Sequence, residues 1–174
     1  MSHHHGGLTV PDVTFKVRIG PDWYDKTTED FFGGTKALVV ALPGAFTPVW
    51  SSKQIPEFED HRSELMKAGV EQIYYLSVND SFVMNAWAES LGVNEEDMIP
   101  DGNGDFTIGM AMGVNKRHVG FGMRTWRYVM YVDDMEIVFF SQEDGMNNDG
   151  SDEDPYVNTK PQVVLDWFDT TKKF

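Results

Sequence analysis

The 174-residue chain contains no cysteine at all. This absence excludes a disulfide bond, a thiolate metal site and a thiol that cycles between oxidised and reduced forms. The cellular compartment therefore cannot be inferred from disulfide usage. At this length a single domain buries enough apolar surface to fold without covalent cross-links.

Basic residues are also scarce, because 14 Lys and Arg stand against 28 Asp and Glu, a net charge of −14. This balance argues against binding to nucleic acids or to anionic membrane surfaces, since both are polyanions. No apolar run approaches the ~20 residues that span a bilayer. The first residues lack the charged-then-apolar order of a signal peptide, so we expect a cytoplasmic protein.

Residues 1–7, Met-Ser-His-His-His-Gly-Gly, look like a tag or a disordered end rather than a metal site. We expect residues 8–174 to form one domain. Alternating apolar and polar residues over 10–17 predict a strand, and residues 23–24 predict a second one that completes an N-terminal hairpin. A short capped helical turn is expected to follow from Thr28.

Continuous apolar runs at 37–42 and 73–78 are typical of strands buried on both faces of a sheet. Between them, apolar side chains spaced by three to four residues predict a helix over 47–68, which Pro56 kinks and Gly69 ends. Asp80 and Gly92 are placed to cap a second helix at its two ends. This order predicts parallel strands joined by right-handed crossovers.

A hairpin with strands 126–132 and 135–140 and a final helix over 160–171 complete the pattern. The acidic, apolar-poor segment 141–155 is expected to be a surface loop. Parallel βα units followed by a hairpin and a closing helix predict a thioredoxin-like α/β sandwich, with a central mixed sheet flanked by helices.

Residues 43–52 read Pro-Gly-Ala-Phe-Thr-Pro-Val-Trp-Ser-Ser. This stretch resembles the active-site loop of peroxiredoxins, whose pattern is Pro-x-x-x-Thr-x-x-Cys. The nucleophilic cysteine of that pattern matches Trp50. The resemblance therefore names a family and, within the same ten residues, removes the atom that performs its chemistry.

Further segments resemble the atypical (type 5, or type II) peroxiredoxins in the same order along the chain: 77–87, 100–107, 120–128 and 154–156. The resemblance covers roughly residues 10–170. It implies a thiol-dependent peroxidase that reduces hydrogen peroxide and alkyl hydroperoxides in antioxidant defence. It also implies a thiol reductant (glutathione, glutaredoxin or thioredoxin), a homodimer and no cofactor.

The resemblance assigns roles to three residues besides position 50. Thr47 would hold the peroxide, Pro43 would shield the site from bulk water, and Arg127 would stabilise the thiolate. A cation and a helix N-terminus both lower the pKa of a thiol, and only the thiolate attacks peroxide. Two simpler interpretations stay open: Arg127 as a strand arginine paired with a surface acid, and Thr47-Pro48 as a helix N-cap followed by proline.

Trp50 cannot replace the cysteine, because indole has one N–H donor and no nucleophile at neutral pH. Ser51 and Ser52 are no substitute, since a hydroxyl needs a neighbouring base. Gln54 is a smaller departure from relatives, which often carry histidine there. The bulk of tryptophan in a tight pocket leads us to predict that Trp50 occludes or distorts it.

Two classes of function therefore remain. The chain is a peroxiredoxin scaffold without peroxidase turnover, either an engineered variant or a natural pseudo-enzyme, or it is a non-catalytic binding or regulatory module on that scaffold. Phe46, Phe82 and Phe121 are candidate interface aromatics for a dimer. The Asp101-x-Asn103-x-Asp105 run imitates a calcium loop, but Phe106 stands where that loop requires glycine, so we expect no metal site.

Overall fold

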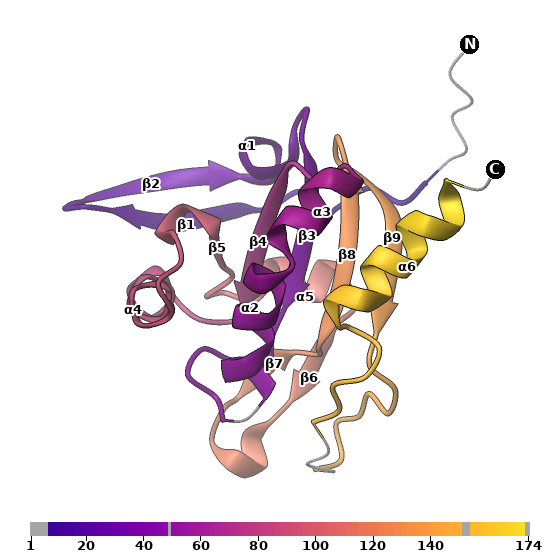
Figure 1. Ribbon diagram of the computed structural model, residues 1–174. Coiled ribbons are helices and arrows are strands. Elements are labelled where there is room, and N and C mark those ends of the chain that lie inside the picture. The colour runs from indigo at the N-terminus through magenta and orange to yellow at the C-terminus, as the bar shows by residue number, and fades with distance from the viewer. Residues whose placement is uncertain (1–6, 49, 151–153, 173–174) are drawn as a thin grey trace.

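The computed structural model describes residues 7–48, 50–150 and 154–172, and at Trp50 it describes the backbone but not the side chain. The predicted tag-like segment lies outside the described residues except for Gly7. Three layers are visible in Figure 1, with a twisted sheet between two sets of helices.

Five strands form the central sheet, in the order β5-β4-β3-β8-β9. Their bounds are β3 (Lys36–Ala41), β4 (Gln72–Ser77), β5 (Met98–Pro100), β8 (Tyr128–Asp133) and β9 (Glu136–Gln142). Strands β3, β4 and β5 run parallel, whereas β8 is antiparallel to both β3 and β9. The mixed sheet and the parallel βα units confirm the predicted thioredoxin-like sandwich.

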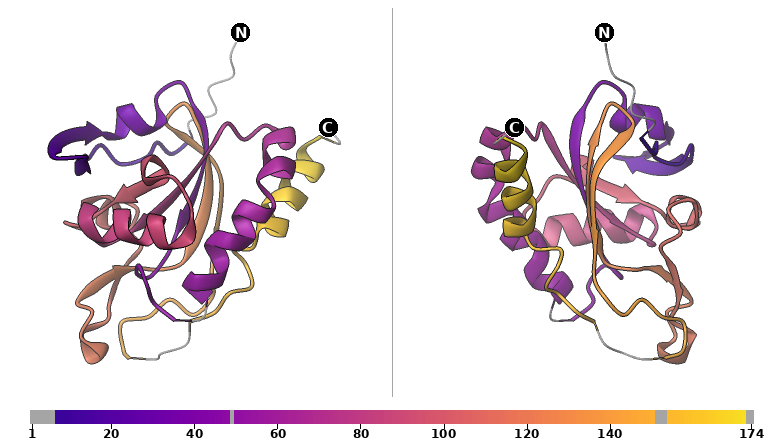
Figure 2. Two further views of the ribbon diagram at one scale, coloured as in Figure 1. Left: turned by 60° about the vertical axis from the view of Figure 1, so that its left-hand side comes forward. Right: turned by 90° about the vertical axis from the view of Figure 1, so that its right-hand side faces the viewer.

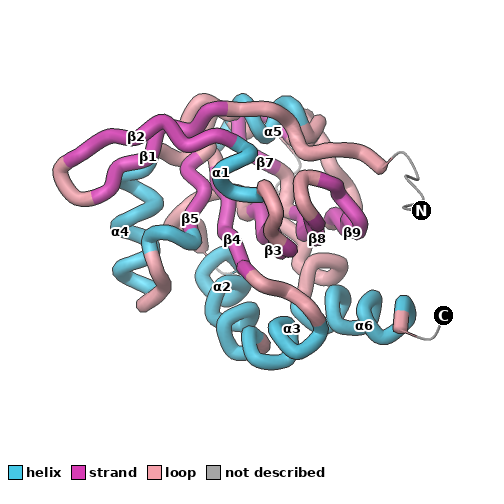
Figure 3. The backbone as a smooth tube through the Cα atoms, turned by 90° about the horizontal axis from the view of Figure 1, so that it is seen from above, coloured by secondary structure: helices cyan, strands magenta, loops and turns pink. Residues whose placement is uncertain are grey.

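Helices lie on both faces of this sheet. On one face are α2 (Trp50–Asp60), α3 (Arg62–Ala68) and α6 (Pro161–Thr171), which Figure 2 shows side by side. On the other lie α1 (Thr28–Phe32), α5 (Asp105–Gly109) and a hairpin of β1 (Thr14–Ile19) and β2 (Asp22–Thr27), seen from above in Figure 3. Helix α4 (Ser81–Leu91) packs beside β5.

Alternation along β3 explains why both faces are dry. Leu38 and Val40 point into a core with α2, α3, α4 and α6, whereas Ala37 and Val39 point into a second core with Phe15, α1 and α5. Because successive strand residues face opposite sides, one continuous apolar run supplies both cores. The strand is buried along five of its six residues.

Four smaller elements complete the described part of the chain. They are the short strands β6 (Gly113–Asn115) and β7 (Met123–Thr125), which pair with each other, and the 3₁₀ turns η1 (Glu95–Asp97) and η2 (Arg117–Val119). Within the described part of the chain, no helix has both the length and the apolar composition needed to cross a bilayer.

The predicted helix over 47–68 is wrong in two respects. It begins at Trp50, and it is divided at His61 into two helices. Pro56 lies inside the first of them, and the expected kink there stays a prediction. At the break the Glu57 carbonyl accepts from both the backbone N–H (3.3 Å) and the ring Nδ1 (2.8 Å) of His61. The predicted C-cap at Gly69 is confirmed.

Three other boundaries differ from prediction. The first strand begins at Thr14 rather than at residue 10, because the Val10 N–H bonds the Met135 carbonyl instead. The β8–β9 hairpin turns at Asp134-Met135, both with positive φ, rather than at Asp133-Asp134. The expected surface loop 141–155 begins as the end of β9 and contains Glu143, which is fully buried.

Candidate functional site

The loop after β3 places Pro43 and Thr47 at the carboxyl end of the parallel strands. Asn79, which follows β4, accepts the Ala45 N–H at 2.9 Å and the Ser77 hydroxyl at 2.6 Å. The Thr47 hydroxyl donates to the Gly44 carbonyl at 2.7 Å. The loop is thus fixed from the neighbouring strand and from within itself.

Gly44 packs closely against two side chains, which a larger residue here would displace. A Cβ at this position would lie 2.7 Å from Nη1 of Arg124 and 2.9 Å from Cγ2 of Thr47. The next residue but one, Phe46, adopts a left-handed backbone with φ of 60°. Such a conformation is strained for a bulky residue and is maintained only by its surroundings.

Thr47 does not act as the N-cap of α2. Its hydroxyl is directed to the Gly44 carbonyl, and the helix begins three residues later, at Trp50. The alternative of a Thr-Pro helix start is therefore wrong. Ser52 donates its hydroxyl to the Thr47 carbonyl at 3.2 Å, which ties the first turn of α2 to the loop.

Arg127 lies between β7 and β8 and is almost completely buried, with 1% of its surface exposed. Its Nη1 donates to Oε1 of Gln54 at 2.5 Å, and its Nη2 donates to both carboxylate oxygens of Asp154 at 2.8 and 2.9 Å. Its Nε finds no hydrogen-bond partner among the described residues. Position 50 precedes Gln54 by one turn of α2, so the two positions share a helix face.

The segment of residues 154–159, which we call the strap, contacts α2 and carries the partner of Arg127. The buried Glu143 carboxylate accepts the backbone N–H groups of Val157 and Asn158 at 2.5–2.9 Å. Gln54 donates to the Thr159 carbonyl at 3.1 Å. The strap is therefore attached to both β9 and α2.

Tyr156 adds a further attachment of the strap to α2. Its hydroxyl donates to Oε2 of Glu57 at 2.7 Å, and burial, followed by the Glu57 carboxylate, raises the pKa of this phenol. The guanidinium of Arg127 lies 5.8 Å from the ring centroid. A neutral phenol that donates to a carboxylate is the expected state here at neutral pH.

A cavity of 340 Å³ opens beside these groups. Its walls are mainly apolar and include Pro43, Thr47, Val119, Phe121, Trp126 and Asp154. The Lys116 ammonium lies 5.9 Å from the Trp126 ring centroid at its side. The predicted residues Pro43 and Thr47 thus meet the carboxylate that holds Arg127, in one cavity of a size suited to a small ligand.

The side chain of Trp50 lies outside the described residues, so its expected occlusion of the pocket remains a prediction. Its neighbour Ser51 is fully buried, and its hydroxyl has no hydrogen-bond partner among the described residues. Within the described part of the chain no base accepts its proton, and the expectation that Ser51 is no nucleophile stays a prediction.

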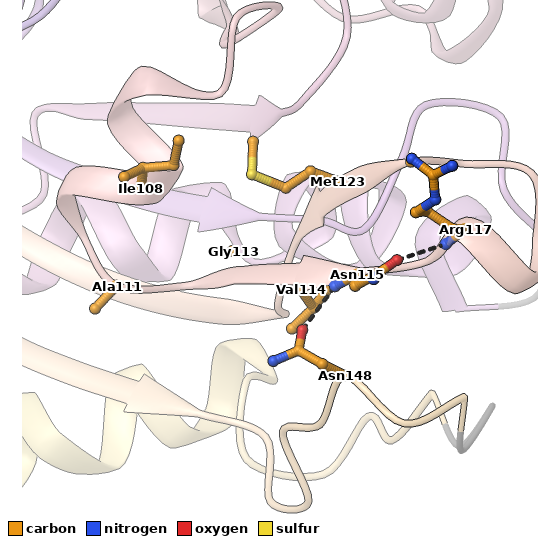
Figure 4. A pocket seen from close by; sticks show the side chains of 9 residues that line it. Ile108, Ala111, Gly113, Val114, Asn115, Arg117, Met123 and Asn148 are labelled. Carbon is orange, nitrogen blue, oxygen red and sulfur yellow. Dashed lines mark hydrogen bonds between the residues drawn. The ribbon is translucent and has the colours of Figure 1, made fainter.

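A larger cavity of 540 Å³ lies at β6 and β7 and contains no such constellation. In Figure 4 the Asn148 amide oxygen accepts the Asn115 N–H at 2.7 Å, while the Arg117 guanidinium points away from Asn148. The described residues contain no cluster of three or more His, Asp or Glu side chains that could hold a metal. The Asp101 carboxylate accepts hydrogen bonds from the backbone N–H groups of Phe106 and Thr107, and it thereby stabilises the first turn of α5.

The Redoxin family model matches residues 7–158. The chain is 44% identical to "Peroxiredoxin y4vD" of Sinorhizobium fredii, over 94% of this chain and 93% of the relative. It is 47% identical to "Peroxiredoxin sll1621" of Synechocystis, over 79% of each protein. The chain belongs to the peroxiredoxin family.

Solved peroxiredoxin structures share the whole architecture. The Plasmodium falciparum antioxidant protein, a 1-Cys peroxiredoxin, superposes with a TM-score of 0.85 at 29% identity and covers 94% of this chain and 98% of its own. Reduced Prx3 of Vibrio vulnificus in complex with hydrogen peroxide superposes with a TM-score of 0.81 at 28% identity, over 97% and 98% of the two chains. These likenesses show that the chain has the fold of solved peroxiredoxins, while the assignment of the loop, α2 and Arg127 to the family site stays a prediction.

Sequence inspection of this peroxiredoxin missed the partners of Arg127. Asp154 stands in segment 154–156, which resembles the family, Gln54 stands where relatives often carry histidine, and Glu143 falls in the predicted surface loop. Glu143 lies three residues beyond the predicted strand 135–140, beside Asp144 in an acidic segment, and nothing in a single sequence shows that one of these carboxylates turns inward.

Proposed function

We propose that this chain is a peroxiredoxin that has no peroxidase turnover, because Trp50 occupies the position of the nucleophilic cysteine. The observation that carries the proposal is the joint presence of a family loop at α2 and a chain without any sulfur nucleophile. Peroxide reduction by this family needs a thiolate that becomes a sulfenic acid. Methionine thioethers are oxidised stoichiometrically and provide no such cycle.

In this proposal the other site residues keep their family roles. Thr47 presents its hydroxyl beside the first turn of α2, Pro43 covers the loop, and Arg127 supplies the positive charge. The substrate class inherited from the family is hydrogen peroxide or an alkyl hydroperoxide, and the reductant is a thiol such as glutathione, glutaredoxin or thioredoxin. The assembled loop and the buried arginine support these assignments.

A second candidate function is a non-catalytic binding or regulatory module on the same scaffold. The mainly apolar 340 Å³ cavity favours it, since a binding site needs no nucleophile. A homodimer through Phe46, Phe82 and Phe121 belongs to either candidate; these rings are 55%, 57% and 40% exposed. A cytoplasmic location stays a prediction that cell fractionation can test.

The decisive experiment restores the nucleophile. The unchanged chain should consume no peroxide catalytically with a small dithiol as reductant, and Trp50→Cys should turn over. Trp50→Ala is the matched control, because it removes the same bulk without adding a thiol. Multiple turnovers by the unchanged chain would contradict the proposal. A folded but inactive Trp50→Cys protein would favour the binding module.

A further inference from the structure

The buried guanidinium of Arg127 is paired with a carboxylate that comes from 27 residues further along the chain. Asp154 contacts Nη2 with both oxygens, at 2.8 and 2.9 Å. The side chain of Arg127 is 1% exposed, whereas that of Asp154 is 43% exposed. One end of this ion pair is therefore fixed in the protein interior and the other reaches solvent.

A buried guanidinium without a counter-charge is strongly destabilising, so the fold must supply an anion. In a cysteine-containing site of this family a thiolate would lie near the arginine. This chain has no cysteine, and among the described residues Asp154 is the carboxylate in ion-pair contact with Arg127. The carboxylates of Glu57 and Glu143 instead accept hydrogen bonds, from the Tyr156 hydroxyl and from the strap amides respectively.

Asp154 is held in place by the strap and does not reach Arg127 by chance. The strap is fixed at Val157 and Asn158 by Glu143, at Tyr156 by Glu57, and at Thr159 by Gln54, which itself accepts from Arg127. Because Gln54 contacts both the arginine and the strap, the two are positioned relative to each other from α2. Asp154 also lines the 340 Å³ cavity.

We propose that Asp154 is a positioning residue that neutralises Arg127 and thereby withholds this guanidinium from ligands of the cavity, which leaves Lys116 as the cation among the lining residues. In the chain as it stands, a small anion at this site meets the Lys116 ammonium but not the charge of Arg127, which Asp154 balances. Removal of the Asp154 charge leaves a buried guanidinium that recruits an exogenous anion. The inference rests on the proposed function only in taking Arg127 as the family arginine.

The first test uses the Trp50 chain and inorganic sulfate. Asp154→Asn should lower the unfolding midpoint by about 5 °C, as expected for breaking a partly exposed pair to a buried arginine in a protein of this size. Sodium sulfate should then raise the midpoint of Asp154→Asn more than that of the unchanged chain. Asp144→Asn, on the same acidic loop and exposed, is the matched control and should behave like the unchanged chain. Equal midpoints and equal sulfate responses would overturn the proposal.

A double-variant cycle protects the test against a simple folding failure. In an Arg127→Gln background, Asp154→Asn should cost little, because the charge that it compensates is gone. An unfolded Asp154→Asn protein beside a folded double variant supports the pair. The proposal would be refuted if Asp154→Asn lowered the unfolding midpoint as much in the Arg127→Gln background as in the unchanged chain.

A purely structural role for Asp154 would not change a thiol placed at position 50. In the Trp50→Cys background, the additional Asp154→Asn change should increase the rate of alkylation by iodoacetamide at pH 6 about tenfold, because a free cation nearby stabilises the thiolate. An unchanged or slower rate would contradict the inference. None of these measurements uses peroxide, so turnover by the Trp50 chain would refute the proposed function and leave this inference standing.

Discussion

Glu143 offers the sharpest test of how the site is supported, because its buried carboxylate holds the strap to β9. It accepts the Val157 N–H at 2.6 and 2.9 Å and the Asn158 N–H at 2.5 and 2.8 Å. The Thr159 hydroxyl lies 3.4 Å from Oε2. We predict that Glu143→Gln loosens the strap at Val157 and Asn158, while its contacts to α2 through Tyr156 and Thr159 and the remainder of the fold persist.

The magnitude follows from the donors that the substitution leaves unsatisfied. Hydrogen bonds to a charged group contribute about 1.5–3 kcal/mol each. Glutamine keeps one acceptor oxygen but turns an NH₂ group toward backbone donors, so roughly one of the two bonds is lost and the other weakened, about 2–4 kcal/mol in total. For a chain of this length that loss corresponds to a fall of roughly 5–15 °C in the unfolding midpoint.

Amide hydrogen exchange separates local release from global destabilisation. In Glu143→Gln the amides of Val157 and Asn158 should lose protection, while those of β3 and β4 should follow the change in global stability alone. Glu89→Gln on the exposed side of α4 is the control and should leave the strap amides unchanged. Protected strap amides in Glu143→Gln would refute the argument that this carboxylate fixes the strap.

Two further predictions concern the other polar and apolar supports of the fold. Burial raises the pKa of the Asp97 carboxyl, so the folded state binds this proton more tightly than the unfolded state does. The protonated carboxyl therefore contributes to stability at low pH, and this contribution is lost as the pH rises through the folded-state pKa. The loss in free energy of unfolding caused by Asp97→Asn, measured by urea titration against the unchanged protein, should therefore become smaller from pH 4 to pH 8. A loss that stays the same over this range would contradict the prediction. Phe168→Ala should cost about 3–4 kcal/mol in the same assay, because the ring is buried and lies 5.0 Å from the Tyr131 ring, whereas Val163→Ala on the same helix should cost much less.

The sheet and its order were predictable from the sequence because their signals are local. A run such as 37–42 has no polar position, so it must be buried on both faces, and the following helix determines that the next strand is parallel. The caps of α4 at Asp80 and Gly92 are confirmed for the same reason, since a cap is decided by a few adjacent residues. The break between α2 and α3 at His61 was not predictable in this way, because the local sequence pattern does not show where tertiary contacts divide a helix.

The site was predictable only as far as the family pattern extends. Pro43, Thr47 and Arg127 stand in motifs, whereas the groups that hold Arg127 lie 73 residues before it and 27 after it. Contacts between residues so far apart in the chain follow no regular spacing, so a single sequence does not reveal them. The acidic composition of segment 141–155 predicted solvent exposure, and this was wrong for Glu143 because its charge is satisfied by backbone amides of the strap.

The supports of the loop bear on what the loss of a cysteine does to the site. Asn79 holds the loop through the Ala45 amide, and Thr47 is held by the Gly44 carbonyl. Neither contact involves position 50, and the charge of Arg127 is balanced by Asp154 without a thiolate. These contacts therefore hold the loop without any contribution from a thiol at position 50. For that reason we expect the cysteine of Trp50→Cys to lie beside a loop that is already held in place. The reactivity of this thiol then depends on how strongly the Asp154 carboxylate neutralises the charge of Arg127.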